Sequence, residues 1–173
     1  DSRESLLESL VRLKRDTVEI LYFHDPTVLW GNPDFFARAR KNVEAKRAKM
    51  LGVSIYSPNE LEQAMRTPGV EAVQLPVNIA DGRFSRELLR SASDRGIALY
   101  ARSLFLQGAL LETERALPEA LAELEPVLLG LRKESASTGR SVLELAVNWA
   151  KAVPGIKGVI LGAESENELV QIA

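Results

Sequence analysis

Apolar positions along this chain follow two alternating patterns. Short continuous runs rich in β-branched and aromatic residues are typical of buried strands, whereas apolar residues spaced three or four apart are typical of helices. The continuous runs predict five strands, at residues 17–23, 50–54, 71–75, 97–101 and 156–161. Helical patterns lie around and between them, at residues 6–13, 33–47, from 58 onward, 84–94, 118–124, 126–137 and 142–153.

Helix starts are marked by a serine followed three residues later by a glutamate. In such a capping box each side chain accepts a hydrogen bond from the other residue's backbone N–H. Three boxes are predicted, at Ser57 with Glu60, Ser141 with Glu144, and Ser165 with Glu168. Pro58 at the first helical position strengthens the first of them.

Strands that alternate with helices, and that are apolar at nearly every position, favour an α/β fold with a parallel sheet covered on its faces. Two architectures fit: an open doubly wound sheet, or a partial (β/α)₈ TIM barrel of five parallel strands with flanking helices. A complete barrel needs about 250 residues, and this chain has 173. No linker or repeat divides it, so residues 1–173 are expected to form a single domain.

Composition narrows the classes of partner. Apolar residues make up 46% and charged residues 27% of the chain, and the net charge is −2, which gives no reason to expect nucleic acid or a membrane surface. The absence of cysteine and the single histidine leave no metal site expected. No apolar run approaches the roughly 18 residues that cross a bilayer. A soluble, cytoplasmic protein is the expectation.

Function in parallel α/β folds is found at the carboxyl ends of the strands. The residues predicted at this edge are His24, Ser54, Gln74 with Asn78, Arg102 with Ser103, and, as a glycine turn after the last strand, Gly162 with Ala163. Their convergence on one rim is more informative than any single residue.

Each of these groups has a structural alternative to a functional role. His24 could donate a hydrogen bond to a substrate carbonyl or shuttle a proton, or be satisfied by nearby backbone. Gln74 could bind a cofactor carboxamide, or a loop carbonyl. Arg102 could bind a phosphate or a flat ring, or pair with a carboxylate. Neither a Rossmann fingerprint nor a P-loop is present.

Five segments together resemble the aldo/keto reductase family. They match the family in order and spacing from its fourth strand to its eighth: LYFHDP at 21–26, LGVSIYS at 51–57, VQLPVN at 73–78, RSLFLQGALL at 102–111 and VILGAES at 159–165. The resemblance covers essentially the whole chain. It implies a (β/α)₈ barrel that binds NADP(H) or NAD(H) and reduces an aldehyde or ketone, a small-molecule carbonyl substrate, to an alcohol.

The resemblance also implies residue roles. His24 matches the catalytic histidine that orients the carbonyl. Ser54 and Gln74 match the residues that hold the nicotinamide carboxamide, and Arg102 stands where many members stack an aromatic on the nicotinamide ring. The remaining matches are Ser103, Leu106 and Gln107 toward the pyrophosphate, and Gly162, Ala163, Ser165 and Glu168 toward the adenosine end.

Three departures from the family pattern affect what is carried over. Ile55 replaces a frequent asparagine, which removes one carboxamide contact. Glu168 stands where NADPH-preferring members often have an arginine, and a carboxylate there favours NADH because it repels a 2′-phosphate; the same residue could serve only its capping box. The family's catalytic aspartate, tyrosine and lysine precede the fourth strand, and no residue here takes those positions. The tyrosines of this chain, Tyr22, Tyr56 and Tyr100, lie in or just after strands that the family does not use for its acid.

A half barrel has two unpaired sheet edges and an inner face without its covering layer, expected to include Val53, Val73 and Leu75. The chain could be part of a longer polypeptide, which we favour, a fragment that pairs with the missing N-terminal half or a second copy, or a truncated relative. Alone it is expected to be inactive. The functional alternative is a non-catalytic barrel remnant that binds cofactor or assembles with partners. A third alternative is an unrelated doubly wound nucleotide-binding protein.

Overall fold

In the computed structural model the described residues are 2–106, 108–111, 119–162, 166 and 170. They form one sheet, whose strands are β1 (Val18–Phe23), β2 (Ala48–Ser54), β3 (Ala72–Pro76), β4 (Ala98–Arg102) and β5 (Ile156–Val159). The α-helices are α1 (Ser2–Leu13), α2 (Pro26–Gly31), α3 (Pro33–Glu44), α4 (Pro58–Arg66), α5 (Arg86–Asp94), α6 (Glu125–Thr138) and α7 (Val142–Lys151). A 3₁₀ helix, η1 (Glu119–Leu124), leads into α6.

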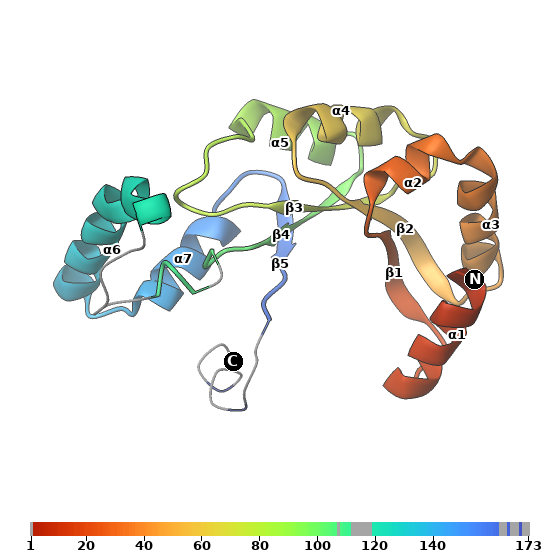
Figure 1. Cartoon of the computed structure of the whole chain (residues 1–173), viewed down its shortest axis with the longest axis horizontal. Helices are drawn as coiled ribbons and strands as arrows, with labels where there is room; N and C mark the ends of the chain where they lie inside the picture. The colour runs from red at the N-terminus through yellow and green to blue at the C-terminus, as the bar shows by residue number, and fades with distance from the viewer. Residues whose placement is uncertain (1, 107, 112–118, 163–165, 167–169, 171–173) are drawn as a thin grey trace.

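The sheet runs in chain order. All neighbouring strands are parallel, and the order is β1-β2-β3-β4-β5 with no reversal. A doubly wound sheet reverses its order at a switch point, so the doubly wound alternative is wrong for the described strands. Figure 1 shows the sheet as an arc, with α4 and α5 along its outer side. This is the α/β architecture of a partial (β/α)₈ barrel, with five parallel strands and flanking helices.

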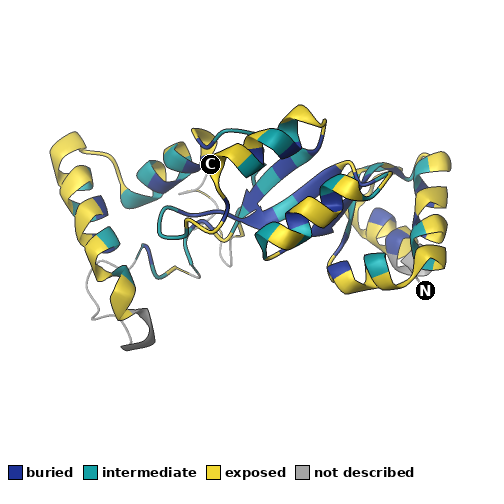
Figure 2. Ribbon diagram, turned by 90° about the horizontal axis from the view of Figure 1, so that it is seen from above, coloured by how far each residue is buried: buried dark blue, intermediate teal, exposed yellow. Residues whose placement is uncertain are grey.

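One face of the sheet packs against the helices. Phe23, Val53, Val73 and Leu99 lie side by side in successive strands, and all are buried in one core together with residues of α3, α4, α5 and α7. Figure 2 shows the buried strands beneath helices whose outer surfaces are exposed. The core therefore lies between the sheet and the helices, as in a barrel's outer layer.

The residues expected on the inner face of the barrel lie on the opposite face of the sheet, so that prediction is wrong. Val53, Val73 and Leu75 belong to the core on the helix side. Because successive side chains in a strand alternate between faces, the opposite face carries the other set of strand residues: Tyr22, Gly52, Ser54, Ala72, Gln74, Ala98, Tyr100 and Arg102. The polar residues Ser54 and Gln74 lie on this second face, and the apolar residues on their own do not reveal which set faces which side.

Two predicted helix starts are confirmed as capping boxes. The Ser57 hydroxyl accepts from the N–H of Glu60, while the Glu60 carboxylate accepts from the N–H of Ser57; Ser141 and Glu144 do the same for α7. The third predicted box, at Ser165 and Glu168, lies outside the described residues. Helix α2 was not predicted, because six residues are too few to show a helical period.

Candidate functional site

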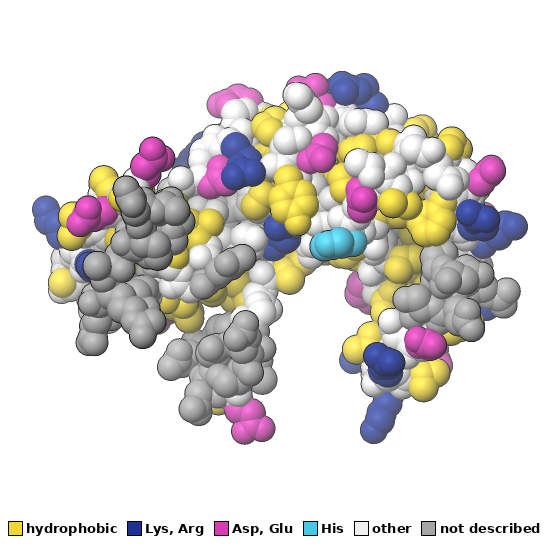
Figure 3. Space-filling view, in the orientation of Figure 1, with side chains coloured by type: hydrophobic (Ala, Val, Ile, Leu, Met, Phe, Trp, Pro, Cys, Tyr) yellow, Lys and Arg dark blue, Asp and Glu magenta, His cyan; other side chains and the backbone are white. Residues whose placement is uncertain are grey.

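The predicted polar groups of the first four strands lie at one edge of the sheet. His24 follows β1 directly, Ser54 is the last residue of β2, Gln74 lies in β3 and Arg102 ends β4. Since all strands are parallel, these positions share the carboxyl edge. In Figure 3 the molecule is hollowed beneath the arch, and the histidine lies at the top of that hollow.

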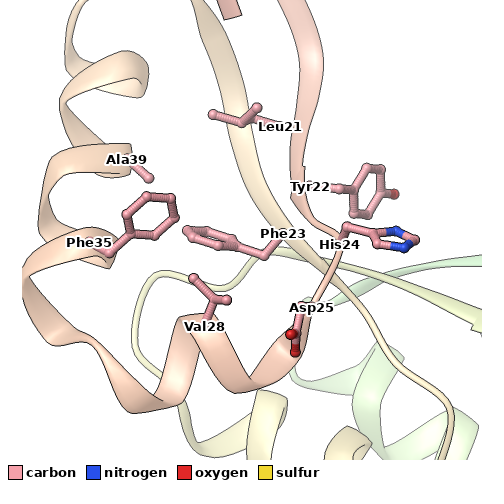
Figure 4. Close-up of a pocket in the computed structure, with 8 residues that line it drawn as sticks. All are labelled: Leu21, Tyr22, Phe23, His24, Asp25, Val28, Phe35 and Ala39. Carbon is pink, nitrogen blue, oxygen red and sulfur yellow. The ribbon is translucent and has the colours of Figure 1, made fainter. Parts of the chain in front are cut away.

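His24 faces away from the helices. Figure 4 shows its imidazole on the same side of β1 as Tyr22, whereas Phe23 points toward Phe35 of α3. The side chain is exposed, and no described residue forms a hydrogen bond with the imidazole. The alternative of a histidine satisfied by nearby backbone therefore has no support among the described residues. An exposed imidazole at a strand end has both nitrogens available to a ligand.

Asp25 fixes the turn that follows His24. Its carboxylate accepts hydrogen bonds from the hydroxyl of Thr27 at 2.6 Å and from the N–H of Thr27 at 2.8 Å, as the N-cap of α2. These two bonds, the hydroxyl first, hold the pKa of Asp25 below its usual value. These hydrogen bonds of the carboxylate thus go to α2, and its interaction with His24 is electrostatic.

A groove of about 290 Å³ runs along β1 at the edge opposite β2. Its lining is mostly apolar and comes from β1, α2 and α3: Leu21, Tyr22, Phe23, His24, Asp25, Val28, Phe35 and Ala39. Ser54, Gln74 and Arg102 do not line it. The groove therefore lies at the unpaired edge of the sheet and is separate from the predicted cofactor residues. His24 lines the groove and also lies at the carboxyl edge of the sheet, where those residues are found.

Ser54 and Gln74 are direct neighbours across β2 and β3. Ser54 is 2% exposed and Gln74 is half-buried. No described residue forms a hydrogen bond with the side-chain amide of Gln74, so the loop-carbonyl alternative has no support among the described residues. A half-buried amide without a protein partner is a suitable group for a ligand amide.

Arg102 is held by neutral groups. Its Nη2 donates to the carbonyl of Ile55 at 3.1 Å, and its guanidinium carbon lies 4.2 Å from the centre of the Tyr56 ring. Its Nη1 donates to the hydroxyl of Ser103 at 3.2 Å. Pairing with a carboxylate is not seen among the described residues. The Nε atom of Arg102 is buried without a partner, so this N–H is an unsatisfied donor within the site.

Two residues that the sequence did not single out complete this corner. Tyr56 stacks on Arg102. Arg83, in the loop after β3, donates from Nη1 to the carbonyl of Tyr56 at 3.0 Å and pairs through Nε with Asp81 at 2.8 Å. These contacts join loops that are distant in the sequence, and no local pattern indicates them.

The loop after β4 has a tight backbone. Ser103 and Leu106 both adopt positive φ angles, 58° and 48°. Ser103 is exposed, and Leu106 packs against a second small core that contains Leu110 and Leu128. Gln107 lies outside the described residues. Of the two described residues of this predicted set, Ser103 is exposed and Leu106 is partly buried.

The predicted adenosine end is described only in part. Gly162 is exposed and follows β5, whereas Ala163, Ser165 and Glu168 lie outside the described residues. In the described part of the chain no cluster of three or more metal-ligating side chains is found. No helix there is both long enough and apolar enough to cross a membrane.

Two solved structures with a similar fold are aldo-keto reductases. The chain is similar to aldo-keto reductase AKR11C1 from Bacillus halodurans in its holo form, at 24% identity and a TM-score of 0.76, over 99% of this chain and 59% of that one. It is also similar to an aldo/keto reductase from Brucella melitensis, at 18% identity and a TM-score of 0.67, over 99% and 60%. Both likenesses show the fold.

Sequence comparison points the same way. The chain is 24% identical over 179 residues to YqkF of Bacillus subtilis (strain 168), described as an uncharacterized oxidoreductase, covering 96% of this chain and 57% of that protein. The chain thus spans less than two thirds of the length of its relatives. The model of the aldo/keto reductase family matches residues 1–173. The chain belongs to the aldo/keto reductase family.

Proposed function

We propose that this chain forms the cofactor side of an NAD(P)H-dependent oxidoreductase that reduces an aldehyde or ketone to an alcohol. The observation that carries the proposal is that Ser54 and its partner Gln74 lie on one face of the sheet near its carboxyl edge, with Arg102 at the end of β4 and His24 directly after β1. When bound, the nicotinamide supplies a hydride. Residues 1–173 are proposed to form a single domain. By resemblance to the family, this domain would correspond to the part of the barrel from the fourth to the eighth strand.

The residues present fit a nicotinamide on the evidence of their unused hydrogen-bonding groups. Gln74 has a free amide among the described residues, and it neighbours the hydroxyl-bearing Ser54. These two would hold the carboxamide. Ile55 adds nothing there, because its side chain is fully buried and its carbonyl is used by Arg102. Arg102 has a planar guanidinium on a partly exposed side chain at the end of β4 and would lie against the ring.

His24 would orient the substrate carbonyl. An exposed imidazole at the mouth can donate a hydrogen bond to the carbonyl oxygen and so favour negative charge there. The proton for that oxygen would come from the family's tyrosine, tuned by its lysine and aspartate. These three belong to strands outside this chain, and the 173 residues alone are therefore proposed to be inactive.

The missing strands are proposed to complete the barrel next to β1 and β5. Each of these strands has only one neighbour among the described strands, and an open edge invites pairing. The groove along β1, with its apolar lining, supports a further strand and its packing at that edge. An intact mass well above 19.1 kDa would support a longer polypeptide; a mass equal to this chain would favour a fragment, or a non-catalytic remnant that binds or assembles.

A fluorescence titration of the complete polypeptide with NADH and NADPH tests the proposal. Wild type should bind one of them, and Gln74→Ala should weaken binding because a carboxamide partner is lost. Gln63→Ala, on the exposed surface of α4, is the matched control and should bind as wild type does. If neither nucleotide binds wild type, the proposal is wrong.

Cofactor choice is proposed to favour NADH, because a carboxylate at position 168 repels a 2′-phosphate. Glu168→Arg should then shift the preference toward NADPH. An unchanged preference would mean that Glu168 serves only its helix. Substrate identity, the adenosine contacts of Gly162, Ala163 and Ser165, and the pyrophosphate contacts of Ser103, Leu106 and Gln107 remain predictions, as does the cytoplasmic location.

A further inference from the structure

We infer that Tyr56 is a positioning residue that sets the plane of the Arg102 guanidinium at the mouth of the barrel, and thereby the binding of the nicotinamide ring. The inference rests on the proposed function and deepens it. Tyr56 matches none of the cofactor-contact positions assigned above. Its role follows from its contacts with Arg102, Glu60 and Arg83.

Consecutive residues hold Arg102 in two directions. The carbonyl of Ile55 accepts from Nη2 at 3.1 Å, which fixes the guanidinium within its plane. The ring of Tyr56, with its centre 4.2 Å from the guanidinium carbon, fixes the orientation of that plane. A cation held over an aromatic face is attracted to the ring's negative quadrupole. Together the two contacts define the position of a group that otherwise ends a long, rotatable side chain.

The backbone of Tyr56 is itself fixed on both sides. Its N–H donates to the Glu60 carboxylate at 2.7 Å, and that carboxylate also caps α4 at Ser57. Its carbonyl accepts from Arg83, which is anchored by Asp81. The ring therefore approaches Arg102 from a rigid turn.

Core packing does not explain the ring. Tyr56 is 50% exposed, so it buries less apolar surface than the tyrosines within the sheet. Its hydroxyl forms no hydrogen bond with a described residue. The side chain covers a charged group at a strand end, where one donor of that group is still free. The contact with Arg102 is made by the face of the aromatic ring, and a phenylalanine at position 56 would offer the same face.

The test uses the complete polypeptide and compares Tyr56→Ala, Tyr56→Phe and Arg102→Ala. Because an exposed cation–π contact is weak, Tyr56→Ala should raise the Kd for the preferred nucleotide by about two- to fivefold. Tyr56→Phe should bind as wild type does. The KM for a carbonyl substrate at saturating nucleotide should not change, because the substrate is held elsewhere. Leu129→Ala, which removes an exposed leucine on α6, controls for the loss of surface apolar area.

A double variant separates positioning from a general loss of structure. If Tyr56 acts through Arg102, Tyr56→Ala should add nothing to the loss already caused by Arg102→Ala. Additive losses would overturn the inference, and so would unchanged or tighter nucleotide binding by Tyr56→Ala, since tighter binding would mean that the ring blocks the site. Failure of wild type to bind either nucleotide is a different result, which removes the proposed function.

Discussion

The ring of Tyr22 lies across Gly52 of the neighbouring strand. The two residues are register partners in β1 and β2, and a β-carbon at position 52 would lie 2.6 Å from Cε1 of Tyr22 and 3.0 Å from the carbonyl oxygen of Ala72. The same relationship recurs between β4 and β5, where a β-carbon at Gly158 would lie 3.2 Å from the Tyr100 ring. The face beneath the predicted cofactor row is thus built by matching large residues to glycines.

We predict that Gly52→Ala destabilises the protein by about 1–3 kcal/mol, the usual cost of overpacking. The Tyr22 ring would have to move, and the Ala72 carbonyl is fixed within the sheet. Thermal unfolding followed by circular dichroism measures the effect. The control is Gly82→Ala, because nothing lies within 4 Å of a β-carbon there, and it should change stability by less than about 0.5 kcal/mol. Equal stability of the two variants would contradict the tight fit.

Tyr22→Phe is predicted to stabilise the protein by about 1 kcal/mol, since the Tyr22 hydroxyl is buried without a partner and an unmet donor costs free energy. Denaturant unfolding at neutral pH measures the gain. Tyr56→Phe removes a hydroxyl from a half-exposed ring and should leave stability unchanged. A loss of stability in Tyr22→Phe would mean that the hydroxyl is hydrogen-bonded in the complete protein.

The same hydroxyl predicts a dependence on alkaline pH. Burial, and to a lesser degree the charge of Tyr100, raises the pKa of Tyr22 well above its ordinary value. A group whose pKa is raised on folding contributes stability below its unfolded pKa, and this contribution is lost as the pH rises beyond it. The free energy of unfolding of wild type should therefore fall above about pH 10, and less steeply in Tyr22→Phe. Parallel curves for the two proteins would contradict the assignment.

The sequence predicts the parallel strands and the polar residues near their carboxyl ends for a physical reason, but it leaves the strand order open between a barrel and a doubly wound sheet. A glutamine in an otherwise apolar strand, or a histidine directly after one, stands out at once, and parallel strands bring such residues to one edge. The face that each strand turns toward the helices is not predictable in the same way. In β3 the polar Gln74 marks the face turned away from the helices, whereas in β2 Gly52 and Ser54 are small and as buried as Val53, so burial there does not distinguish the two faces.

Contacts between loops are the other part that the sequence does not reveal. The stacking of Tyr56 on Arg102 joins the ends of β2 and β4 across β3, and it depends on how far the barrel arc curves. Helix α2 was missed for a simpler reason, since its start at Asp25 and Pro26 resembles the end of a strand followed by a turn. The contact between Tyr56 and Arg102 depends on tertiary geometry, and helix α2 is too short to show a helical period in the sequence.

Asp25→Ala is predicted to loosen α2 without unfolding the core. The variant loses both hydrogen bonds to Thr27, while the residues that pack β1 against the helices are untouched. Amide hydrogen exchange at Thr27 and Val28 should speed up in Asp25→Ala and much less in Asp25→Asn, because asparagine also caps helices. Unaltered exchange in the alanine variant would show that α2 is held by Leu29 and Pro26 alone.

Acid should act on the same cap. Because the pKa of Asp25 is lowered in the folded state, its contribution is present at neutral pH and is lost as the pH falls below about 4. Exchange at Thr27, corrected for its intrinsic pH dependence, should therefore accelerate in acid in wild type. The Asp25→Asn variant has no group to protonate and should give a flat profile; a matching acceleration there would assign the effect to another carboxylate.

His24→Ala, made in the complete polypeptide, is predicted to lower kcat by about 10²- to 10³-fold, the range for loss of one hydrogen-bond donor to the oxygen on which negative charge develops. Nucleotide Kd should stay near that of wild type, because the predicted carboxamide and ring contacts come from β2, β3 and β4. Stopped-flow turnover and a fluorescence titration separate the two effects. Its exposure, its side of β1 and its lack of a described hydrogen-bond partner all argue that the fold does not depend on His24, so the variant should unfold at the wild-type temperature. Losses of equal size in turnover, nucleotide binding and thermal stability would instead make His24 a structural residue of the turn between β1 and α2.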